Sequence, residues 1–492
     1  MPETVPETTD PALWTATRQA AAIRNRTLSS RELLAAMTAR IERLNPAVNA
    51  VVTLDLARGV AAATAADAAT ARGESSGPLH GLPVTIKDAL AVAGLRSTGG
   101  AVELRDHVAM VDADAPARAF AAGAYCFGKT NLPRWSGDIQ SYNEIFGTTN
   151  NPWNLLLVPG GSSGGAATAV ALGMTSFEIG TDIGGSIRIP AAYCGVAGHK
   201  PSYGLVPCGG YLDGPDGGLT EPDINVHGPI ARSVDDLELL LGVLAGPTPE
   251  RAKAWTVALA PPRRASVEGL RVALWADDPG CPVSAATASA VRGAGAALDA
   301  AGAHVDDSAR PAFEPGAAAL LGLGLVGSAI TPSLSDGEFA YLAAIAGDRN
   351  QPADQAEMIG AYVIGHRGWL GLDRERARVR RAWAAFFENH DVLLCPVIAC
   401  PPFPHLQTGS FGDRTIEIDG ATRPYRDLIW WTVLIGMAYL PSTVVPVGRT
   451  VDGLPIGVQV VGPYLEDRTT LAVARALVEL CGPITPPPMA LA

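Results

Sequence analysis

Gly160-Gly-Ser-Ser-Gly-Gly165 and Gly180-Thr-Asp-Ile-Gly-Gly-Ser-Ile-Arg-Ile-Pro190 are the two stretches that decide how this chain folds. Both lie within residues 159–201, where glycine is very dense. Glycine loses much backbone entropy on folding, but it permits close backbone approach and unusual dihedral angles. Val170, Phe177 and Ile179 are interspersed among the glycines, which argues against low-complexity disorder. We therefore interpret this segment as the tightly packed surroundings of a site.

Ser186 is the first candidate for chemistry in this segment. Gly184 and Gly185 precede it directly, so successive backbone N–H groups can converge on one point and form an anion-binding nest. Such a nest suits the oxyanion of a tetrahedral intermediate. Asp182 and Arg188 flank the serine with opposite charges, and we interpret them as a structural ion pair that holds the loop.

Ser162 and Ser163 allow a different interpretation, because their glycine-rich surroundings match the Gly-x-Ser-x-Gly nucleophile elbow. An α/β-hydrolase with that elbow needs an acid and then a histidine further along the chain, and His390 or His405 are candidates. Pro159, however, would sit in the strand before the elbow, where proline fits poorly. A purely structural Gly/Ser turn is the remaining alternative.

Lys87 lies near the end of a short β-prone run, Gly81-Leu-Pro-Val-Thr-Ile-Lys-Asp88. A lysine that follows an apolar strand is partly buried, and burial lowers its pKa towards neutrality, so that the amine can act as a base. The alternative is a structural lysine that reaches solvent or pairs with Asp88.

Hydrophobic periodicity predicts an α/β layered fold with a mixed sheet, because strands alternate with helices along the chain. Ser29 and Ser30 before Glu32, and Ser233-Val-Asp-Asp236, are helix-start signals. Residues 246–264 are rich in Pro and Ala, which is typical of a connector. Helices are expected within residues 12–44, 48–72, 113–122, 233–244 and 284–302, and strands within 81–88, 125–128, 272–275, 391–396, 442–447 and 454–462.

Composition excludes several classes of protein. Of the 492 residues 48% are hydrophobic and 17% charged, which is incompatible with disorder. The net charge of −12 disfavours nucleic acid or an anionic membrane as partner. Seven scattered cysteines without a Cys-x-x-Cys pair indicate reduced thiols, and eight histidines without a His-x-x-x-His pair make a metal site unexpected. The N-terminus is acidic and shows no signal peptide, so we expect a cytoplasmic protein.

One uncharged stretch, residues 429–448, is long enough to span a bilayer. It contains Pro441, Ser442 and Pro446, and we predict a buried helix followed by a strand instead.

Several motifs together closely resemble the amidase signature family. The two glycine-rich stretches place Ser162 and Ser186 24 residues apart, the spacing of that family's paired serines. The run that ends in Lys87 looks like its lysine motif. Gly128-Lys-Thr-Asn131, Gly147-Thr-Thr-Asn-Asn-Pro-Trp153, Gly228-Pro-Ile-Ala-Arg-Ser233 and Gly453-Leu-Pro-Ile-Gly457 continue the pattern, so the resemblance covers roughly residues 12–480.

The resemblance implies roles for these residues. Lys87 would be the base, Ser162 a bridging serine held by a cis peptide bond, and Ser186 the nucleophile. The N–H groups of Ile183, Gly184, Gly185 and Ser186 would form the oxyanion hole. A free serine is a weak nucleophile and needs an adjacent base, which fits this assignment. No cofactor is needed.

The resemblance also implies the architecture. We expect a single amidase signature domain over residues 1–492, an α/β/α fold around a large twisted mixed sheet. Within it we expect an N-terminal helical segment at about residues 10–72, a signature core at about 78–245 and an entrance or lid at about 310–385.

The loop before the Asn-Pro-Trp motif lines the acyl pocket in members of this family, and here it reads Trp135-Ser-Gly-Asp-Ile-Gln-Ser-Tyr142. Ser136 and Gly137 are the expected substrate-binding residues, while Trp135 and Tyr142 are equally well core aromatics. Residues 317–369 are rich in Leu, Ala, Gly and Met and predict an apolar mouth, with Trp430, Trp431 and Tyr439 as further candidates.

The expected function is therefore hydrolysis of C–N bonds in apolar aryl or alkyl amides or in carbamates, with esters as further substrates. The expected partners are such a small molecule and, by analogy, a second copy of the chain. An amidase-type subunit of a tRNA-dependent amidotransferase is disfavoured, because that subunit usually has glutamine where this chain has Ile189, and residues 207–226 form a longer, different segment. A nylon-oligomer hydrolase stays a second alternative.

Overall fold

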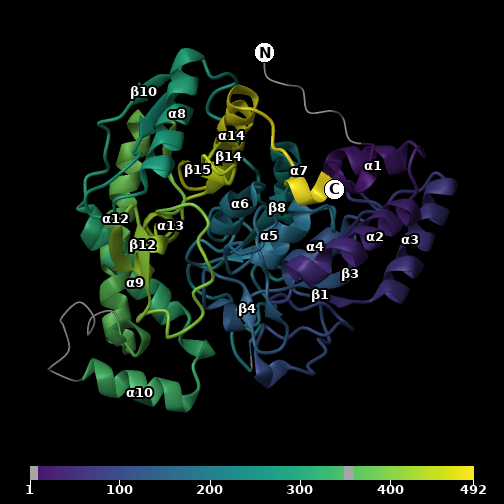
Figure 1. Ribbon diagram of the computed structural model, residues 1–492, viewed down its shortest axis with the longest axis horizontal. Coiled ribbons are helices and arrows are strands. Elements are labelled where there is room, and N and C mark those ends of the chain that lie inside the picture. Colours follow the sequence, from purple (N-terminus) through teal and green to yellow (C-terminus); the bar gives the residue numbers. More distant parts are fainter. Residues whose placement is uncertain (1–8, 216, 348–358, 492) are drawn as a thin grey trace.

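The computed structural model describes residues 9–215, 217–347 and 359–491 (Figure 1). Its largest sheet has eight strands in the order β10-β9-β11-β15-β14-β7-β8-β6. β10 and β11 pair parallel with β9, and the other neighbours pair antiparallel, so the sheet is mixed. The strands are β6 (Glu178–Asp182), β7 (Ala197–Lys200), β8 (Val226–Ala231), β9 (Arg271–Leu274), β10 (His304–Asp306), β11 (Val392–Pro396), β14 (Ser442–Arg449) and β15 (Pro455–Val461).

A separate three-stranded sheet, in the order β1-β3-β2, carries Lys87. It consists of β1 (Val51–Leu54), β2 (Pro83–Lys87) and β3 (Tyr125–Thr130), with β2 parallel and β1 antiparallel to β3. β2 packs beside β6, the edge strand of the large sheet. Two further hairpins are β4 (Tyr142–Asn143) with β5 (Gly147–Thr148), and β12 (Thr415–Ile418) with β13 (Ala421–Pro424).

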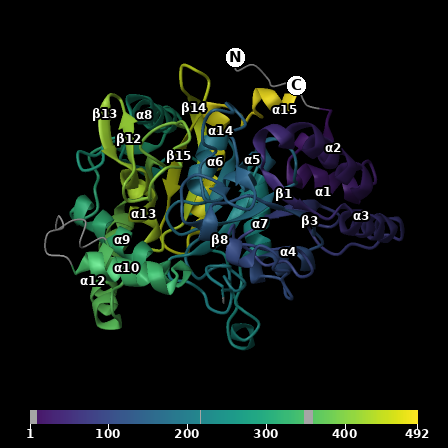
Figure 2. The same cartoon turned by 60° about the horizontal axis from the view of Figure 1, so that its bottom comes forward.

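Helices cover both faces of the large sheet. α7, α8 and α14 pack on one face, and α5 and α6 on the other. In both views α1, α2 and α3 lie at one end of the molecule, and α9, α10 and α12 at the opposite end (Figure 2). The α-helices are α1 (Ala16–Arg24), α2 (Ser30–Val48), α3 (Leu56–Ala71), α4 (Asp114–Ala121), α5 (Gly164–Ala171), α6 (Arg188–Cys194), α7 (Val234–Leu244), α8 (Ala285–Ala300), α9 (Pro315–Ala329), α10 (Asp336–Ala346), α12 (His366–Asn389), α13 (Trp430–Gly436), α14 (Asp467–Cys481) and α15 (Pro488–Leu491). Short 3-10 helices are η1 (Pro11–Leu13), η2 (Val102–Leu104), η3 (Arg134–Ser136), η4 (Arg251–Lys253), η5 (Thr331–Ser333) and η6 (Tyr425–Ile429).

Strand β11 is apolar without interruption because both of its faces are buried. In β11, Val392 and Leu394 join the core under α7, α8 and α14, whereas Leu393 and Cys395 join the core on the opposite face. This alternation follows from the two-residue period of a strand. The layered mixed α/β fold predicted from the sequence is confirmed.

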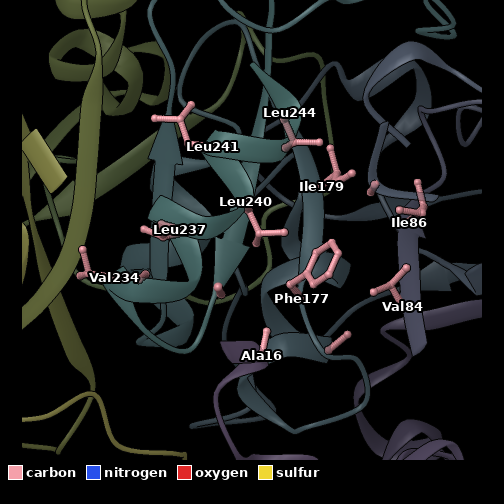
Figure 3. Packing of buried hydrophobic residues seen from close by; sticks show 14 of the residues in the cluster. Ala16, Val84, Ile86, Phe177, Ile179, Val234, Leu237, Leu240, Leu241 and Leu244 are labelled. Carbon is pink, nitrogen blue, oxygen red and sulfur yellow. The ribbon is translucent and has the colours of Figure 1, made fainter. Parts of the chain in front are cut away.

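One hydrophobic cluster connects the two sheets. The leucines of α7 lie near Phe177 and Ile179, and Val84 and Ile86 of β2 belong to the same cluster (Figure 3). Because Val84 and Ile86 take up this side of β2, Thr85 and Lys87 project from the other side of the strand. The packing of β2 therefore decides which way Lys87 points.

Most of the predicted elements are confirmed, and two predictions need correction. Residues 48–72 are not helical throughout, because residues 51–54 form strand β1 and Asp55 caps α3 only after it. The helical periodicity of residues 12–44 is divided among η1, α1 and α2. The predicted capping box of Ser29 and Glu32 is present at the start of α2.

Ser233 caps α7 by accepting from the N–H of Asp236 at 3.1 Å, but the side chain of Asp236 serves another helix. Its carboxylate accepts from the N–H of Ala16 at 3.0 Å and from the N–H and hydroxyl of Thr17 at 2.8 and 2.7 Å. The expected capping box is therefore only half formed, and Asp236 ties α1 to α7.

Residues 429–448 contain helix α13 and most of strand β14. The predicted buried helix followed by a strand is confirmed. Within the described residues, no helix is long and apolar enough to cross a membrane.

Replacing Asp236 by Ala should lower the free energy of unfolding by about 2–4 kcal/mol, since three donors lose their acceptor in a buried place. Urea unfolding followed by circular dichroism measures this. Asp235→Ala is the matched control, because Asp235 is 65% exposed and its ion pair with Arg475 contributes about 1 kcal/mol or less. Equal losses in the two variants would contradict the tie between α1 and α7.

Candidate active site

Lys87 lies at the end of β2, fully buried, with its amine between two hydroxyl groups. Its Nζ donates to Oγ of Ser162 at 2.6 Å and to Oγ1 of Thr181 at 2.7 Å. Burial lowers the pKa of Lys87 from its ordinary value to about 7, although the carboxylates of Asp182 and Glu178 oppose this. A substantial fraction of the amine is therefore neutral near pH 7 and able to accept a proton.

The alternative pairing of Lys87 with Asp88 is wrong. Asp88 lies 3.4 Å from Nζ of Lys129 and accepts from the N–H and hydroxyl of Thr98. The carboxylate that follows Lys87 in the sequence thus belongs to a different lysine.

The loop that carries Ser162 is held by close backbone contacts. The Gly161–Ser162 peptide bond is cis, as the family resemblance implied. A Cβ on Gly161 would come within 2.6 Å of the backbone of residues 139 and 140, so only glycine fits there. Ser141 donates to the carbonyl of Ser162 at 3.2 Å and accepts from the N–H of Gly164, where α5 begins.

Asp182 and Arg188 form the expected ion pair at 2.8 Å, and both side chains are fully buried. The same carboxylate accepts from the N–H groups of Gly185 at 2.9 Å and Ile187 at 3.1 Å. Burial alone would raise the pKa of Asp182, but the charge and hydrogen bonds of Arg188 prevail and hold the pKa at about 2. The ion pair therefore fixes the loop on which Ser186 lies.

One part of the expected oxyanion hole needs correction. The N–H of Gly185 is directed at Asp182 and is already satisfied. The N–H groups of Ile183, Gly184 and Ser186 have no acceptor among the described residues. Gly185 instead shapes the turn. Its φ of +119° is unfavourable for other residues, and a Cβ at this position would lie only 2.7 Å from Thr432, so glycine is required.

Ser186 faces the solvent side of the site, while Ser162 lies behind it. Ser186 lines a cavity and is 9% exposed, whereas Ser162 is fully buried. The N–H of Ser163 donates to the carbonyl of Ser186 at 3.2 Å and joins the two serine loops. Within the described residues the Ser186 hydroxyl makes no hydrogen bond, so its proton is not committed to another acceptor.

The cavity above Ser186 has a volume of about 410 Å³. Ser136 and Gly137 line it, as expected, together with Asp138 and Ile183. Most of its wall is apolar and comes from α9, α10 and nearby residues: Leu323, Val326, Ile330, Leu342, Ile345, Ile359, Tyr362, Phe411 and Ile429. Ser410, Asp413 and Arg426 add polar groups to the wall. Part of the predicted mouth, residues 348–358, lies outside the described residues. A larger hollow of about 600 Å³ between α12 and residues 463–466 contains none of the predicted site residues.

The aromatic candidates for this wall are wrong. Trp430 and Trp431 are buried against Trp275, and Tyr439 stacks on Tyr203, so none of them lines the cavity. Trp135 is buried with Ala101 and Leu212 and is a core residue.

Several site residues were missed in the sequence. Thr181 accepts from Lys87, and its position directly before Asp182 in the glycine-rich stretch was the available signal. Thr432 donates to the carbonyl of Gly184 at 2.7 Å. Asp138, at the cavity, binds Arg414 at 2.7 Å and accepts from Tyr425 at 3.0 Å. Thr432, Arg414 and Tyr425 lie more than two hundred residues away along the chain.

The nucleophile-elbow alternative lacks its base. The hydroxyl of Ser162 accepts a hydrogen bond from Lys87. The hydroxyl of Ser163 donates a long hydrogen bond to the carbonyl of Thr181 at 3.4 Å. His390 stacks on Phe386 and forms a hydrogen bond with the carbonyl of that residue. The ring nitrogens of His405 have no partner among the described residues. Neither histidine is therefore hydrogen-bonded to Ser162 or Ser163.

The fold and this Lys-Ser-Ser arrangement define a class of α/β enzymes, and the comparison with known families agrees with it. Residues 32–471 match the family model described as Amidase, and the chain belongs to this amidase signature family of hydrolases.

Relatives with different activities cover nearly the whole chain. One of them, from a glutamyl-tRNA(Gln) amidotransferase of Synechococcus sp. (strain CC9902), is 34% identical over 92% of this chain and 93% of its own length. An acylamidase of Rhodococcus erythropolis is 33% identical over 93% of this chain and 94% of its own. Similarity alone therefore does not select the substrate.

The solved structures lead to the same family. A bacterial aryl acylamidase of the amidase signature enzymes has a TM-score of 0.79 at 27% identity, covering 95% of this chain and 96% of that one. A 6-aminohexanoate cyclic dimer hydrolase has a TM-score of 0.77 at 28% identity, covering 98% and 99%.

Asp182→Ala should lower the free energy of unfolding by about 3–5 kcal/mol, because it leaves Arg188 charged, buried and unpaired. Urea unfolding is the measurement. Asp427→Ala serves as control, since Asp427 is 28% exposed and pairs at 3.1 Å with Arg423, four residues earlier in the chain, a contact worth about 1 kcal/mol or less. A loss below that of the control would show that the loop does not depend on the ion pair.

Proposed function

We propose that this protein hydrolyses the C–N bond of amides or carbamates through an acyl-enzyme formed on Ser186. The observation that carries the proposal is the fully buried amine of Lys87, 2.6 Å from the hydroxyl of Ser162. A buried amine with a pKa near 7 is a base adapted to neutral pH.

In the proposed relay, neutral Lys87 takes the proton of Ser162 while Ser162 takes the proton of Ser186. The freed oxygen of Ser186 attacks the carbonyl carbon of the substrate. No hydrogen bond joins the two serine hydroxyl groups in the described structure, so the relay requires a side-chain rotation when substrate binds. Catalytic hydrogen bonds commonly tighten only in the complex.

The negative charge that develops on the carbonyl oxygen would be stabilised by the N–H groups of Ile183, Gly184 and Ser186, which have no acceptor within the described residues. Ser162 would then return a proton to the leaving nitrogen, because an amide anion is a very poor leaving group. Water would hydrolyse the acyl-enzyme by the same relay in reverse. All of these proton transfers use side chains of this chain.

An apolar aryl or alkyl amide, or the matching carbamate, is the substrate that the cavity supports best. Its wall of leucine, isoleucine and valine side chains from α9 and α10 favours an apolar group of moderate size, and about 410 Å³ accommodates one. The similarity to an acylamidase and to an aryl acylamidase supports the same choice. Carbamates share the acyl chemistry, so both substrate types stay in the proposal.

The second candidate is an amidotransferase-type subunit, which the similarity to subunits of glutamyl-tRNA(Gln) amidotransferases favours. Ile189 and the different segment 207–226 speak against it. A panel of anilides, primary amides, aryl esters and carbamates, assayed with the purified chain alone, separates the candidates. Turnover of apolar anilides or carbamates supports hydrolysis, and turnover of none of them supports the second candidate.

Ser186→Ala should abolish turnover, and Lys87→Met should reduce kcat/KM by roughly three orders of magnitude or more, because each removes one end of the relay. Labelling with a fluorophosphonate probe followed by peptide mass spectrometry should place the probe on Ser186. Ser163→Ala is the control and should keep most of the activity. A labelled residue other than Ser186 would overturn the assignment.

The acid limb of the pH profile gives an independent check. Protonated Lys87 cannot accept a proton, so kcat/KM should fall tenfold for each pH unit below the pKa of about 7. The measurement is the pH dependence of kcat/KM for a non-ionising anilide. A profile that stays flat down to pH 5 is incompatible with Lys87 as the base.

A further inference from the structure

Glu178, the first residue of β6, is a fully buried acid that the proposed relay does not use. Its Oε1 accepts from the hydroxyl of Thr85 at 2.6 Å and from the hydroxyl of Thr130 at 3.0 Å. Its Oε2 has no hydrogen-bond partner among the described residues. An ionised carboxylate with one oxygen unpaired in apolar surroundings is costly, so this group is held close to its neutral form.

The two threonines connect Glu178 to the neighbours of Lys87. Thr85 is two residues before Lys87 in β2 and therefore projects from the same side of the strand. Thr130 is the register partner of Lys87 in β3. Glu178 thus contacts both the residue two positions before Lys87 and the register partner of Lys87, and its charge opposes the lowering of the Lys87 pKa.

The same contacts bridge the two sheets. β2 belongs to the small sheet and β6 to the large one, and within the described residues no ladder joins them. The Thr85–Glu178 and Lys87–Thr181 hydrogen bonds are both side-chain links from β2 to β6. Glu178 consequently helps to set where β2 lies relative to the strand that leads to Ser186.

We propose, on the basis of the relay above, that Glu178 is a positioning residue for Lys87: it ties the strand of the base to the strand that leads to the nucleophile and places an ionisable carboxyl group beside the amine. The carboxyl group touches neither the substrate cavity nor Ser162. It acts on the reaction only through the position and protonation of Lys87.

Further titratable groups surround the cluster of Glu178, Thr85, Thr130 and Lys87, and they come from several neighbouring elements. Asp88 follows β2, Cys126 and Lys129 lie in β3, Asp182 ends β6, His227 lies opposite Thr181 in β8, and Tyr211 packs on His227. Burial raises the pKa values of Cys126 and Tyr211 to about 12 and lowers the pKa of His227 to about 3. Asp182 stays ionised beside Arg188. Burial raises the pKa of Asp88, although Lys129 at 3.4 Å opposes this. Burial lowers the pKa of Lys200 in β7, whose charge acts on Asp182, to about 7.

Among these groups, Glu178 and Lys87 both change protonation near neutrality, with pKa values of about 8 and about 7. Burial raises the pKa of Glu178 to about 8, although the hydrogen bonds from Thr85 and Thr130 oppose it. Ionised Glu178 favours the protonated form of Lys87, since opposite charges attract in a medium of low dielectric constant. Loss of the carboxylate therefore lowers the pH at which Lys87 becomes protonated, and never raises it.

Glu178→Gln tests this directly, because glutamine keeps an acceptor for the two threonines but cannot ionise. With an anilide that the wild type hydrolyses, the acid limb of kcat/KM should move to lower pH by a few tenths of a unit to at most about one unit. The shift is limited because Glu178, with a pKa of about 8, is largely protonated where Lys87 titrates. Activity at pH 9 should stay within a few-fold of wild type. Glu479→Gln, an exposed acid of α14, is the control and should leave the limb in place.

Two further variants keep the test decisive if Glu178→Gln folds poorly. Thr85→Val removes a donor that stabilises the ionised carboxylate, so its limb should move in the same direction by a smaller amount. Glu178→Ala also removes the link between the sheets and should lower kcat at least tenfold with KM unchanged.

An acid limb that is identical in wild type, Glu178→Gln and Thr85→Val would overturn the proposal, as would a limb that moves to higher pH. Failure of the relay itself looks different. In that case the wild type has no acid limb, or Lys87→Met keeps its activity.

Discussion

The site depends on one buried contact, the hydrogen bond between the amine of Lys87 and the hydroxyl of Ser162. It requires that an amine be taken out of water, which lowers its pKa, and that a hydroxyl be held within 2.6 Å of it. The apolar cluster behind β2 turns Lys87 toward the buried side that faces Ser162, and the close-packed glycine loop with Ser141 holds the hydroxyl in place. The ion pair of Asp182 with Arg188 then positions the second serine in front of this contact.

Features that depend on nearby residues were predicted from the sequence. The capping box at Ser29, the strand before Lys87 and the helix-then-strand at residues 429–448 follow from local chemistry and periodicity. The ion pair of Asp182 with Arg188 was also accessible, because its members lie six residues apart. Strand β1 was missed although its β-branched residues Val51, Val52 and Thr53 favour a strand, because the alanine-rich run of α3 follows it directly and gives the segment a helical composition.

Features that depend on distant residues were not predicted. Thr432 supports the turn at Gly184 from the far end of the chain, and Arg414 and Tyr425 hold Asp138 at the cavity. The hydrogen bond from the Gly185 N–H to Asp182 was also not predicted. The sequence indicates that a nest of N–H groups can form, but not which of these groups already donates to a side chain. Trp430 and Trp431 were assigned to the cavity because of their residue type, whereas their packing on Trp275 makes them part of the core.

The apolar wall of the cavity and the reacting groups come from different parts of the chain. Lys87 ends β2, Ser162 lies in the loop before α5 and Ser186 in the loop after β6, while the wall is formed largely by α9, α10 and Tyr362. Substitutions in α9 and α10 therefore change the wall of the cavity without touching the contact between Lys87 and Ser162. Engineers who wish to alter which molecules enter the cavity can confine their libraries to these two helices and keep Lys87, Ser162 and Ser186 in place.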